Sequence, residues 1–319
     1  MYRDKVIITH GGKPHMDDTL GVAMLISYAT QTSGYARYMV MRVEHKHVDA
    51  YRDIANSIWV DVGGKHDDSG RFFDHHHDDS LRCSMSLVRE WVERDCMGMS
   101  RSVDTESSLE AYLDYLDRHG PVAANKLGII SDADSDRVYE ISKHVTGLID
   151  HMWTEGAYAY GNKYSWTPHH SIAKVLNSNG WGITIHTLES VLDVLYADFP
   201  KEMQLVDEKL ELDAKLNTED LNNVKVLNDK IAKLPMYYID PEVDNSTYIE
   251  LQALGAGYML RKSSRDPNVT NLVANTDKDC TVHDLKHLVP EESIGFIHAN
   301  GFFMVINLPM TEELIARFK

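Results

Sequence analysis

The sequence predicts an α/β fold with a parallel sheet, followed by a smaller α+β domain that a helical segment joins to it. Two observations predict the sheet: apolar, β-branched runs alternate with helical stretches near the N-terminus, and glycine turns or polar residues follow the runs. The second domain is predicted because a polar, Lys/Glu/Leu-rich segment, residues 188–233, precedes new strand-like runs. We therefore expect residues 1–186 to form the first domain, and residues 187–319 to form the helical linker and second domain.

The first elements follow from hydrophobic patterning. Residues 5–9, KVIIT, are apolar and β-branched, which predicts a buried strand. Residues 18–28 predict a helix whose first turn holds Asp18, since an acidic side chain favours a helix N-terminus. Residues 36–43, ARYMVMRV, predict a second strand, so the first two strands are separated by a helix as parallel pairing requires.

The next segments continue this rhythm. HVDAYRDIA predicts a short helix, SIWVDVGG a third strand that ends in a glycine turn, and RFFDHHH a fourth strand or edge. Helices are expected over residues 84–96, 107–119 and 136–153, and over one or two helices within 188–233. The later strand-like runs are YYIDP, TYIELQALG, TNLVAN and IGFIHANGFFMVI. The final stretch, TEELIARF, predicts a helix with Thr311 as its N-cap.

Composition narrows the class of protein. The 319 residues carry a formal net charge of −17, which argues against a broad basic surface for long duplexes. The sequence has no apolar run long enough to cross a membrane, and MYRDKVIITH resembles no leader peptide, so we expect a cytoplasmic protein without membrane partners. Three cysteines without CxxC spacing predict reduced core thiols.

Metal-capable side chains follow three of the predicted strands. In an open α/β sheet, the carboxyl ends of the strands form the edge where ligands bind. The candidates are His10, His15, Asp17 and Asp18 after the first strand, Asp61 after the third, and Asp74, His75, His76 and His77 after the fourth. This convergence predicts a metal site, although no single motif does so by itself.

The mixture of imidazole and carboxylate indicates the metal. It suits Mn²⁺, Fe²⁺, Co²⁺ or Zn²⁺ better than Ca²⁺, which prefers oxygen ligands alone. We expect Mn²⁺, with Mg²⁺, Co²⁺ or Zn²⁺ as alternatives. The candidates outnumber the ligands of a single ion, so we expect two divalent ions. Such a pair is the standard arrangement for displacement at phosphorus, with metal-activated hydroxide as the nucleophile.

Simpler interpretations exist for several of these residues. Taken alone, His15 and Asp17 would be read as helix caps, and Asp-Val-Gly at Asp61 as a turn. We expect Asp78 and Asp79 to face solvent or to cap a helix. The other polar histidines and acids are expected to be solvated; these are His45, His47, His66, Asp67, Asp68, His169 and His170.

The order of the motifs resembles the DHH phosphoesterase superfamily and, within it, the MYG (melanocyte proliferating gene) family. That family carries T-H-N-G-x-F-H-x-D-E, V-D-V-G-G, Y-D-H-H, L-N-P-x-W and F-V-H-x-x-G-F. The corresponding stretches here are THGGKPHMDD, VDVGG, FDHH, LNSNGW and FIHANGF, in the same order over nearly the whole chain. Departures include Asp18 in place of glutamate and FFMVI in place of a glycine-rich run, so the chain resembles a divergent member.

The resemblance implies specific roles. One metal would take His10, His15 and Asp61, and the other would take Asp17, Asp61 and His75, with Asp61 bridging. A last ligand should come from a stretch similar to D-A-x-D-N-G, and within GIISDADSD we expect Asp134 or, less favoured, Asp132. His76 would contact the scissile phosphate, Asp74 would orient an imidazole, and His77 would have no role. In the second domain His298, Asn300 and Gly301 would contact substrate, unless this histidine is simply buried in a strand and turn.

The activity implied by the resemblance is metal-dependent phosphodiester hydrolysis, in the form of a 3′→5′ exonuclease on RNA or short oligonucleotides. A phosphatase on pyrophosphate, polyphosphate or a small nucleotide is the alternative within this chemistry. A non-catalytic, metal-dependent nucleotide-binding module is the alternative of another class. A homodimer is a possible assembly that the sequence does not test.

Overall fold

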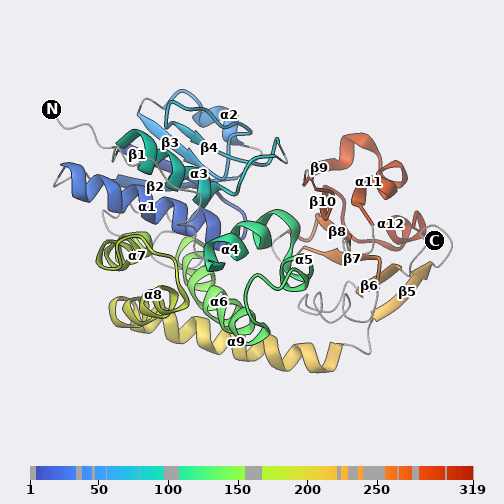
Figure 1. Ribbon diagram of the computed structural model, residues 1–319. Helices are drawn as coiled ribbons and strands as arrows, with labels where there is room; N and C mark the ends of the chain where they lie inside the picture. The colour runs from blue at the N-terminus through green and yellow to red at the C-terminus, as the bar shows by residue number, and fades with distance from the viewer. Residues whose placement is uncertain are drawn as a thin grey trace. The chain divides into compact units, whose positions relative to one another are not determined.

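The computed structural model divides the chain into two compact units (Figure 1). The first unit comprises residues 1–118 and 127–208, and the second comprises residues 119–126 and 209–319. The structure describes residues 5–33, 38–44, 47–54, 56–78, 80–96, 108–154, 167–220, 224–228, 236–239, 256–263, 266–274, 280–298 and 300–318. Within these residues, none of the helices has both the length and the apolar character that a membrane span requires.

A four-stranded parallel sheet forms the centre of the first unit. Its strands are β1 (Lys5–His10), β2 (Tyr38–Val43), β3 (Ser57–Val60) and β4 (Phe72–Phe73), in the order β2-β1-β3-β4. All three pairings are parallel, which confirms the predicted fold class. The side chains of Ile7, Ile8 and Trp59 are fully buried, as expected for strands covered on both faces.

The register aligns the carboxyl ends of these strands. His10 lies opposite Val43, and Thr9 lies opposite Val60. Val60 in turn lies opposite Phe73. The residues directly after β3 and β4 therefore emerge beside the last residue of β1.

Helices make up the rest of the first unit. They are α1 (Met16–Ser33), α2 (Val48–Tyr51), α3 (Ser84–Trp91), a π-helical turn (Val92–Cys96), α4 (Ser108–His119), α6 (Asp132–Thr154), α7 (Pro168–Ser178), α8 (Ile185–Asp198) and the first part of α9 (Pro200–Asp220). Helix α1 packs against α3 and α7, and α8 packs against α6 and α7. The sequence patterns predicted α1, α3, α4 and α6, with α1 and α6 longer than expected, but they did not indicate α7.

The second unit contains a mixed, six-stranded sheet. Its strands are β5 (Val224–Asn228), β6 (Met236–Ile239), β7 (Tyr258–Lys262), β8 (Thr270–Ala274), β9 (Ile294–Ile297) and β10 (Phe303–Ile306), in the order β5-β6-β7-β8-β10-β9. The remaining helices are α5 (Pro121–Lys126), α11 (Val282–Leu285), α12 (Glu312–Ala316) and two 3-10 turns, Lys286–Leu288 and Glu291–Ser293. Thr311 caps α12 as predicted, since its hydroxyl accepts a hydrogen bond from the Leu314 amide at 3.3 Å. The predicted strand TYIELQALG lies outside the described residues.

One helical prediction was wrong. The segment 188–233 was expected to be helical throughout, but residues 224–228 form strand β5. Its sequence, VKVLN, alternates valine with polar or larger residues, and this pattern favours a strand once a partner is available. That partner is β6, which pairs with β5 in antiparallel fashion.

The boundary predicted at residue 186 lies at the start of α8. Because α8 packs on α6 and α7, part of the expected linker belongs to the first unit. The assignment of metal binding to residues 1–186 and of substrate binding to residues 187–319 stays a prediction about function.

Candidate metal centre and active site

The carboxyl edge of the parallel sheet gathers histidine and aspartate side chains from three strands. His10 is the last residue of β1, Asp61 follows β3, and His75 follows β4. His15 and Asp17 lie at the start of α1, which leaves the same edge. The parallel register places these residues together, as the sequence predicted.

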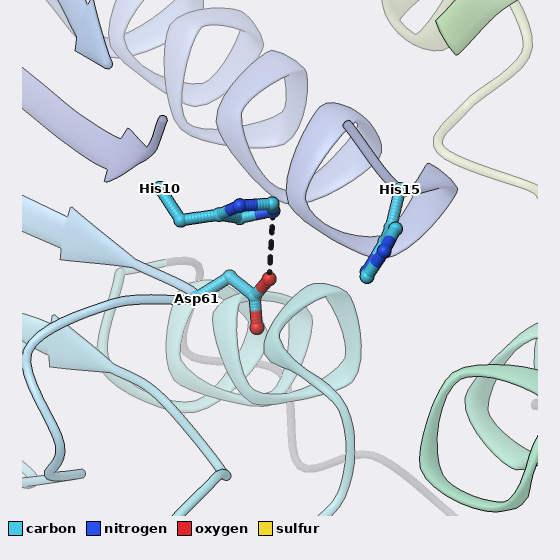
Figure 2. A group of neighbouring side chains, drawn as sticks. All are labelled: His10, His15 and Asp61. Atoms are coloured by element: carbon cyan, nitrogen blue, oxygen red, sulfur yellow. Dashed lines mark ion pairs between the residues drawn. The ribbon is translucent and has the colours of Figure 1, made fainter. Parts of the chain in front are cut away.

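The first group of possible metal ligands consists of His10, His15 and Asp61. Each offers one ligand atom, and the three atoms lie within 4.8 Å of one another. Figure 2 shows the His10 ring joined to the Asp61 carboxylate by an ion pair, with the His15 ring to the right of both. The His10 Nε2 atom lies 3.3 Å from Asp61 Oδ2. This is the ligand set that the family resemblance implied for one metal.

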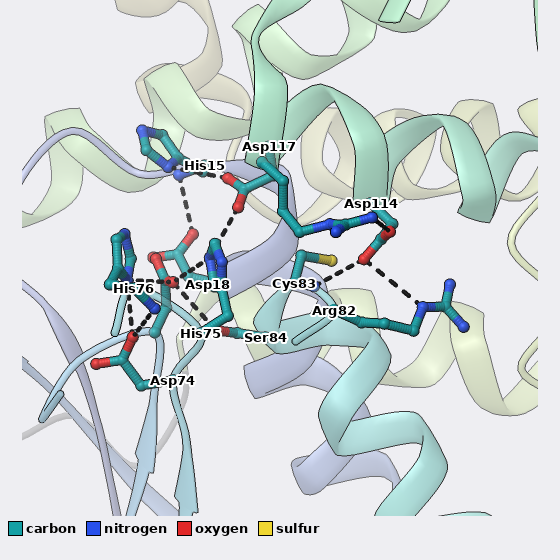
Figure 3. A network of polar contacts seen from close by, with 12 residues as sticks. His15, Asp18, Asp74, His75, His76, Arg82, Cys83, Ser84, Asp114 and Asp117 are labelled. Carbon is teal, nitrogen blue, oxygen red and sulfur yellow. Dashed lines mark hydrogen bonds and ion pairs between the residues drawn. The ribbon is translucent and has the colours of Figure 1, made fainter. Parts of the chain in front are cut away.

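A second group forms around Asp117 of α4. The side chains of His15, Asp17 and Asp117 offer ligand atoms within 4.8 Å of one another, as do those of Asp61, His75 and His76. Asp117 Oδ2 lies 2.9 Å from His75 Nε2, and Asp117 Oδ1 lies 3.4 Å from His15 Nδ1. Figure 3 shows the Asp117 carboxylate directed toward both imidazoles. Asp117 thus contacts both histidines and also lies close to Asp17.

Asp17 provides the test of whether cations fit this site. Its side chain is buried, with 2% of its surface exposed, and neither carboxylate oxygen has a hydrogen-bond partner. Burial and the nearby charges of Asp117, Asp61 and Asp18 raise the pKa of Asp17 well above its ordinary value. A buried carboxylate without a partner is costly unless a cation pairs with it. The residues present therefore fit a metal centre.

The backbone of Asp61 is specially arranged to present its side chain. Asp61 has a positive φ of 59°, a conformation that aspartate adopts more readily than most residues. Its amide donates to the Phe73 carbonyl at 2.9 Å, which fixes it beside β4. The Ser84 hydroxyl donates to Asp61 Oδ1 at 3.0 Å. The backbone and the carboxylate of Asp61 are thus each held by a hydrogen bond.

Asp18 has a supporting position rather than a place among the three ligand groups. One of its oxygens accepts a hydrogen bond from the His15 amide at 2.9 Å, and the other lies 3.3 Å from His10 Nε2. Burial acts to raise the pKa of Asp18, but the charges of His10, Arg42 and His15 outweigh it, so the pKa falls below its ordinary value. Asp18 therefore orients the loop that carries both histidines.

Asp74 and His76 form a pair at the edge of the cluster. The Asp74 carboxylate lies 2.7 Å from His76 Nδ1 and accepts from the Gly64 amide at 2.6 Å. Burial acts to lower the pKa of His76, but the charges of Asp61 and Asp74 raise it above the ordinary histidine value. His76 is 20% exposed, whereas His75 is 3% exposed. His77, which the sequence gave no role, is exposed.

Asp132 and Asp134, the expected last ligands, are not brought to the cluster. Asp132 is exposed at the start of α6. Asp134 Oδ2 accepts from the Ser131 hydroxyl at 2.8 Å, and the Asp134 amide donates to the same hydroxyl at 3.2 Å, so both groups serve the helix terminus. Asp117 instead lies within the cluster, 2.9 Å from His75. The sequence contained a pattern that could have indicated Asp117. Asp114-Tyr-Leu-Asp117 keeps the spacing of the two aspartates in D-A-x-D-N-G.

The prediction that His169 and His170 are solvated was wrong. His169 is 1% exposed, and burial lowers its pKa to about 3. His170 accepts a hydrogen bond from the Thr167 amide at 3.1 Å, which completes a capping box at the start of α7. His169 is buried because α7 packs against α1, whereas His170 is half-buried.

The proposed substrate contacts lie in the second unit. His298 is 6% exposed, and its Nδ1 atom accepts from the Asn300 amide at 3.2 Å. Gly301 has a φ of 70°, and a Cβ atom there would lie 2.9 Å from the His283 ring, so glycine is needed at this turn. The His298 ring also lies against Phe302, with 4.3 Å between the ring centroids. The structure thus shows a tight turn that holds a buried histidine, while its role in substrate binding stays a prediction.

Comparison with known proteins agrees with this architecture. Residues 6–85 match the family model MYG1_exonuc, which is described as an uncharacterised protein family, UPF0160. Among solved structures, the chain is similar to PggH, a pGpG-specific phosphodiesterase from Vibrio cholerae. That similarity covers 99% of each chain with a TM-score of 0.52 and 12% sequence identity, so it shows a shared fold. No curated protein matches the sequence.

The matched segment contains the strand ends that supply His10, Asp61 and His75, and the family resemblance seen in the sequence is thereby confirmed. Residues 6–85 of this chain are thus similar to the MYG family.

Proposed function

We propose that this protein is a 3′→5′ exonuclease that hydrolyses RNA or short oligonucleotides with two divalent metal ions. The observation that carries the proposal is the unpartnered, buried carboxylate of Asp17 within a cluster of imidazoles and further carboxylates. Bound cations would offset the negative charge that such a cluster concentrates. Its position at the carboxyl edge of a parallel sheet is where α/β enzymes bind their ligands.

The ligand groups support two metal positions. One ion would be held by the first group, His10, His15 and Asp61. For the second ion we combine residues of the other two groups, namely Asp17, Asp61, His75 and Asp117, because Asp117 lies 2.9 Å from His75, and Asp61 would be shared. Mixed nitrogen and oxygen ligands favour Mn²⁺ over Ca²⁺. When bound, two such ions would lower the pKa of a coordinated water and offset charge on the phosphate oxygens.

His76 and Asp74 would handle the phosphate. The carboxylate of Asp74 holds His76 Nδ1 and so fixes the orientation of the ring. His76 is more exposed than His75, which supports a division of roles between a buried ligand and an accessible substrate contact. An imidazole held in this way can donate a hydrogen bond to a phosphate oxygen without reorganising during the reaction.

The substrate class is supported from two directions. The structurally similar PggH is named for its specificity toward pGpG, a dinucleotide, and short substrates of this kind are what we propose here. The net charge of −17 also disfavours tight binding of long nucleic acids, because affinity for phosphate chains depends on basic surface. His298, Asn300 and Gly301 are the residues that we propose to contact the nucleotide.

A substrate panel tests the proposal. The Mn²⁺-loaded protein would be incubated with a short RNA labelled at its 5′ end, with pGpG and with pyrophosphate, and the products would be separated. We expect stepwise shortening of the RNA and hydrolysis of pGpG. Hydrolysis of pyrophosphate, but of neither the RNA nor pGpG, would indicate a phosphatase instead of an exonuclease. No turnover of any of the three substrates would indicate a binding module.

A further inference from the structure

Helix α4 buries an acidic face. Glu110, Asp114 and Asp117 are spaced by four and three residues, so they lie on one side of the helix. Glu110 is 0% exposed and Asp114 is 5% exposed, and the Asp117 side chain is 11% exposed. Acidic side chains are rarely buried unless each is paired. Three buried acidic side chains on one helix therefore require three specific partners, and these partners determine the position of α4.

The partners lie on α3 and on the loops that carry the proposed metal ligands. At the first position, Glu110 Oε2 accepts a hydrogen bond from Arg89 Nη1 of α3 at 2.6 Å. At the last position, Asp117 contacts His75 at 2.9 Å. Between them, Asp114 Oδ1 accepts from the backbone amide of Cys83 at 2.7 Å. The middle contact is to a backbone group, so it anchors α4 to a fixed point of the chain.

That fixed point is the N-terminus of α3. Cys83 is the N-cap residue of α3, and its own side chain makes no capping hydrogen bond. Asp114 therefore supplies, from another helix, a carboxylate at an N-terminus where negative charge is favoured. The next residue, Ser84, donates its hydroxyl to Asp61 Oδ1 at 3.0 Å. Figure 3 shows this chain of contacts from Asp114 through Cys83 and Ser84 toward the cluster.

We infer that Asp114 is a positioning residue that sets the place of Asp117 relative to Asp61 and so determines the affinity of the second metal position. The inference rests on the metal-dependent function proposed above. Asp114 lies one helical turn from Asp117. It holds the amide of Cys83, and the next residue, Ser84, orients Asp61. It need not contact either ion or the substrate. Its second oxygen accepts from Arg118 Nη2 at 2.8 Å, so the carboxylate is itself held in place.

The test compares three variants of the full chain. Asp114→Leu removes the acceptor and keeps the branching of the side chain, and Asp114→Asn keeps an oxygen that can accept from the Cys83 amide. Glu110→Leu is the matched control, because it removes a buried acid from the same helix face at a distance from the ligands. Mn²⁺ affinity at each of the two positions would be measured by calorimetry, and thermal unfolding of the metal-free protein would be followed in parallel.

We expect Asp114→Leu to weaken one of the two Mn²⁺ affinities by about ten- to a hundredfold, the range found when groups that orient metal ligands are removed. Asp114→Asn should restore affinity to within about threefold of the unsubstituted protein. Glu110→Leu should lower the unfolding temperature but leave both affinities unchanged. A purely structural role would give Asp114→Leu and Glu110→Leu the same profile, and that result would overturn the inference.

A further variant serves if Asp114→Leu does not fold. Cys83→Pro removes the amide hydrogen that Asp114 accepts, and Cys83 already has a φ of −59°, which proline adopts. It should weaken the same metal position, and unchanged affinity at both positions would again overturn the inference. Failure of the unsubstituted protein to bind Mn²⁺ would instead refute the proposed function, so the two failures are distinguishable.

Discussion

Substitution of Ser84 by alanine tests how the shared carboxylate is held. The Ser84 side chain is fully buried, and its hydroxyl donates to Asp61 Oδ1 at 3.0 Å. A buried hydrogen bond to a charged group contributes about 1.5–3 kcal/mol. Because each 1.4 kcal/mol or so corresponds to about a tenfold change in an equilibrium constant, loss of this orientation should weaken Mn²⁺ binding by about ten- to a hundredfold.

The assay is calorimetric titration of the metal-free protein with Mn²⁺, with Ser86→Ala as the control. Ser86 is also fully buried in the first turn of α3, but its hydroxyl contacts the Cys83 sulfur at 3.7 Å rather than Asp61. The control should therefore bind Mn²⁺ as the unsubstituted protein does. If Ser84→Ala matches Ser86→Ala within about threefold, the reasoning that Ser84 orients a metal ligand is refuted.

Three further predictions concern roles, pH and domain division. Asp61→Ala should lose both metal ions, whereas His76→Ala should keep both ions and lower turnover by at least about a hundredfold. Equal loss of metal from the two variants in elemental analysis would contradict these separate roles. Burial lowers the pKa of His170 to about 4, so its stabilising contribution is complete above the unfolded pKa of 6.5 and is lost as pH falls toward 4. His170→Gln keeps an acceptor for the capping box but does not take up a proton. Near pH 5 its free energy of unfolding should therefore exceed that of the unsubstituted protein by about 1 kcal/mol, after allowance for partial exposure. A difference between the two free energies of unfolding that does not change with pH would refute this. A chain ending at Glu208, where the first unit ends, should bind Mn²⁺ but hydrolyse RNA at least tenfold or so more slowly, and undiminished cleavage by a folded truncation would show that the second unit is not needed.

The parallel sheet was predictable because the sequence pattern that indicates each strand lies within the strand itself. The run at residues 5–9 and the run ending at Val60 are apolar and β-branched, and such runs favour buried strands whatever their neighbours are. The positions of His10, Asp61 and His75 then followed from strand direction alone. This part of the site needed no knowledge of how helices pack.

Asp117 and the histidines of α7 were not found because their environment depends on helix packing. Asp117 follows no strand, and its approach to His75 depends on how α4 docks through its buried acidic face. His169 is buried because α7 packs on α1, and no local pattern indicates that contact. Strand β5 was likewise missed, since a strand of five residues within a helix-like segment is stabilised mainly by its partner β6.

The most direct test of the two-metal site is anomalous diffraction at the manganese edge from crystals grown with Mn²⁺. We predict two peaks per chain at the carboxyl edge of the parallel sheet, both within coordinating distance of Asp61. The peak nearer Asp17 should also be coordinated by His75 and Asp117. A single peak, a peak coordinated by Asp134 in place of Asp117, or no peak in a folded protein would contradict the account.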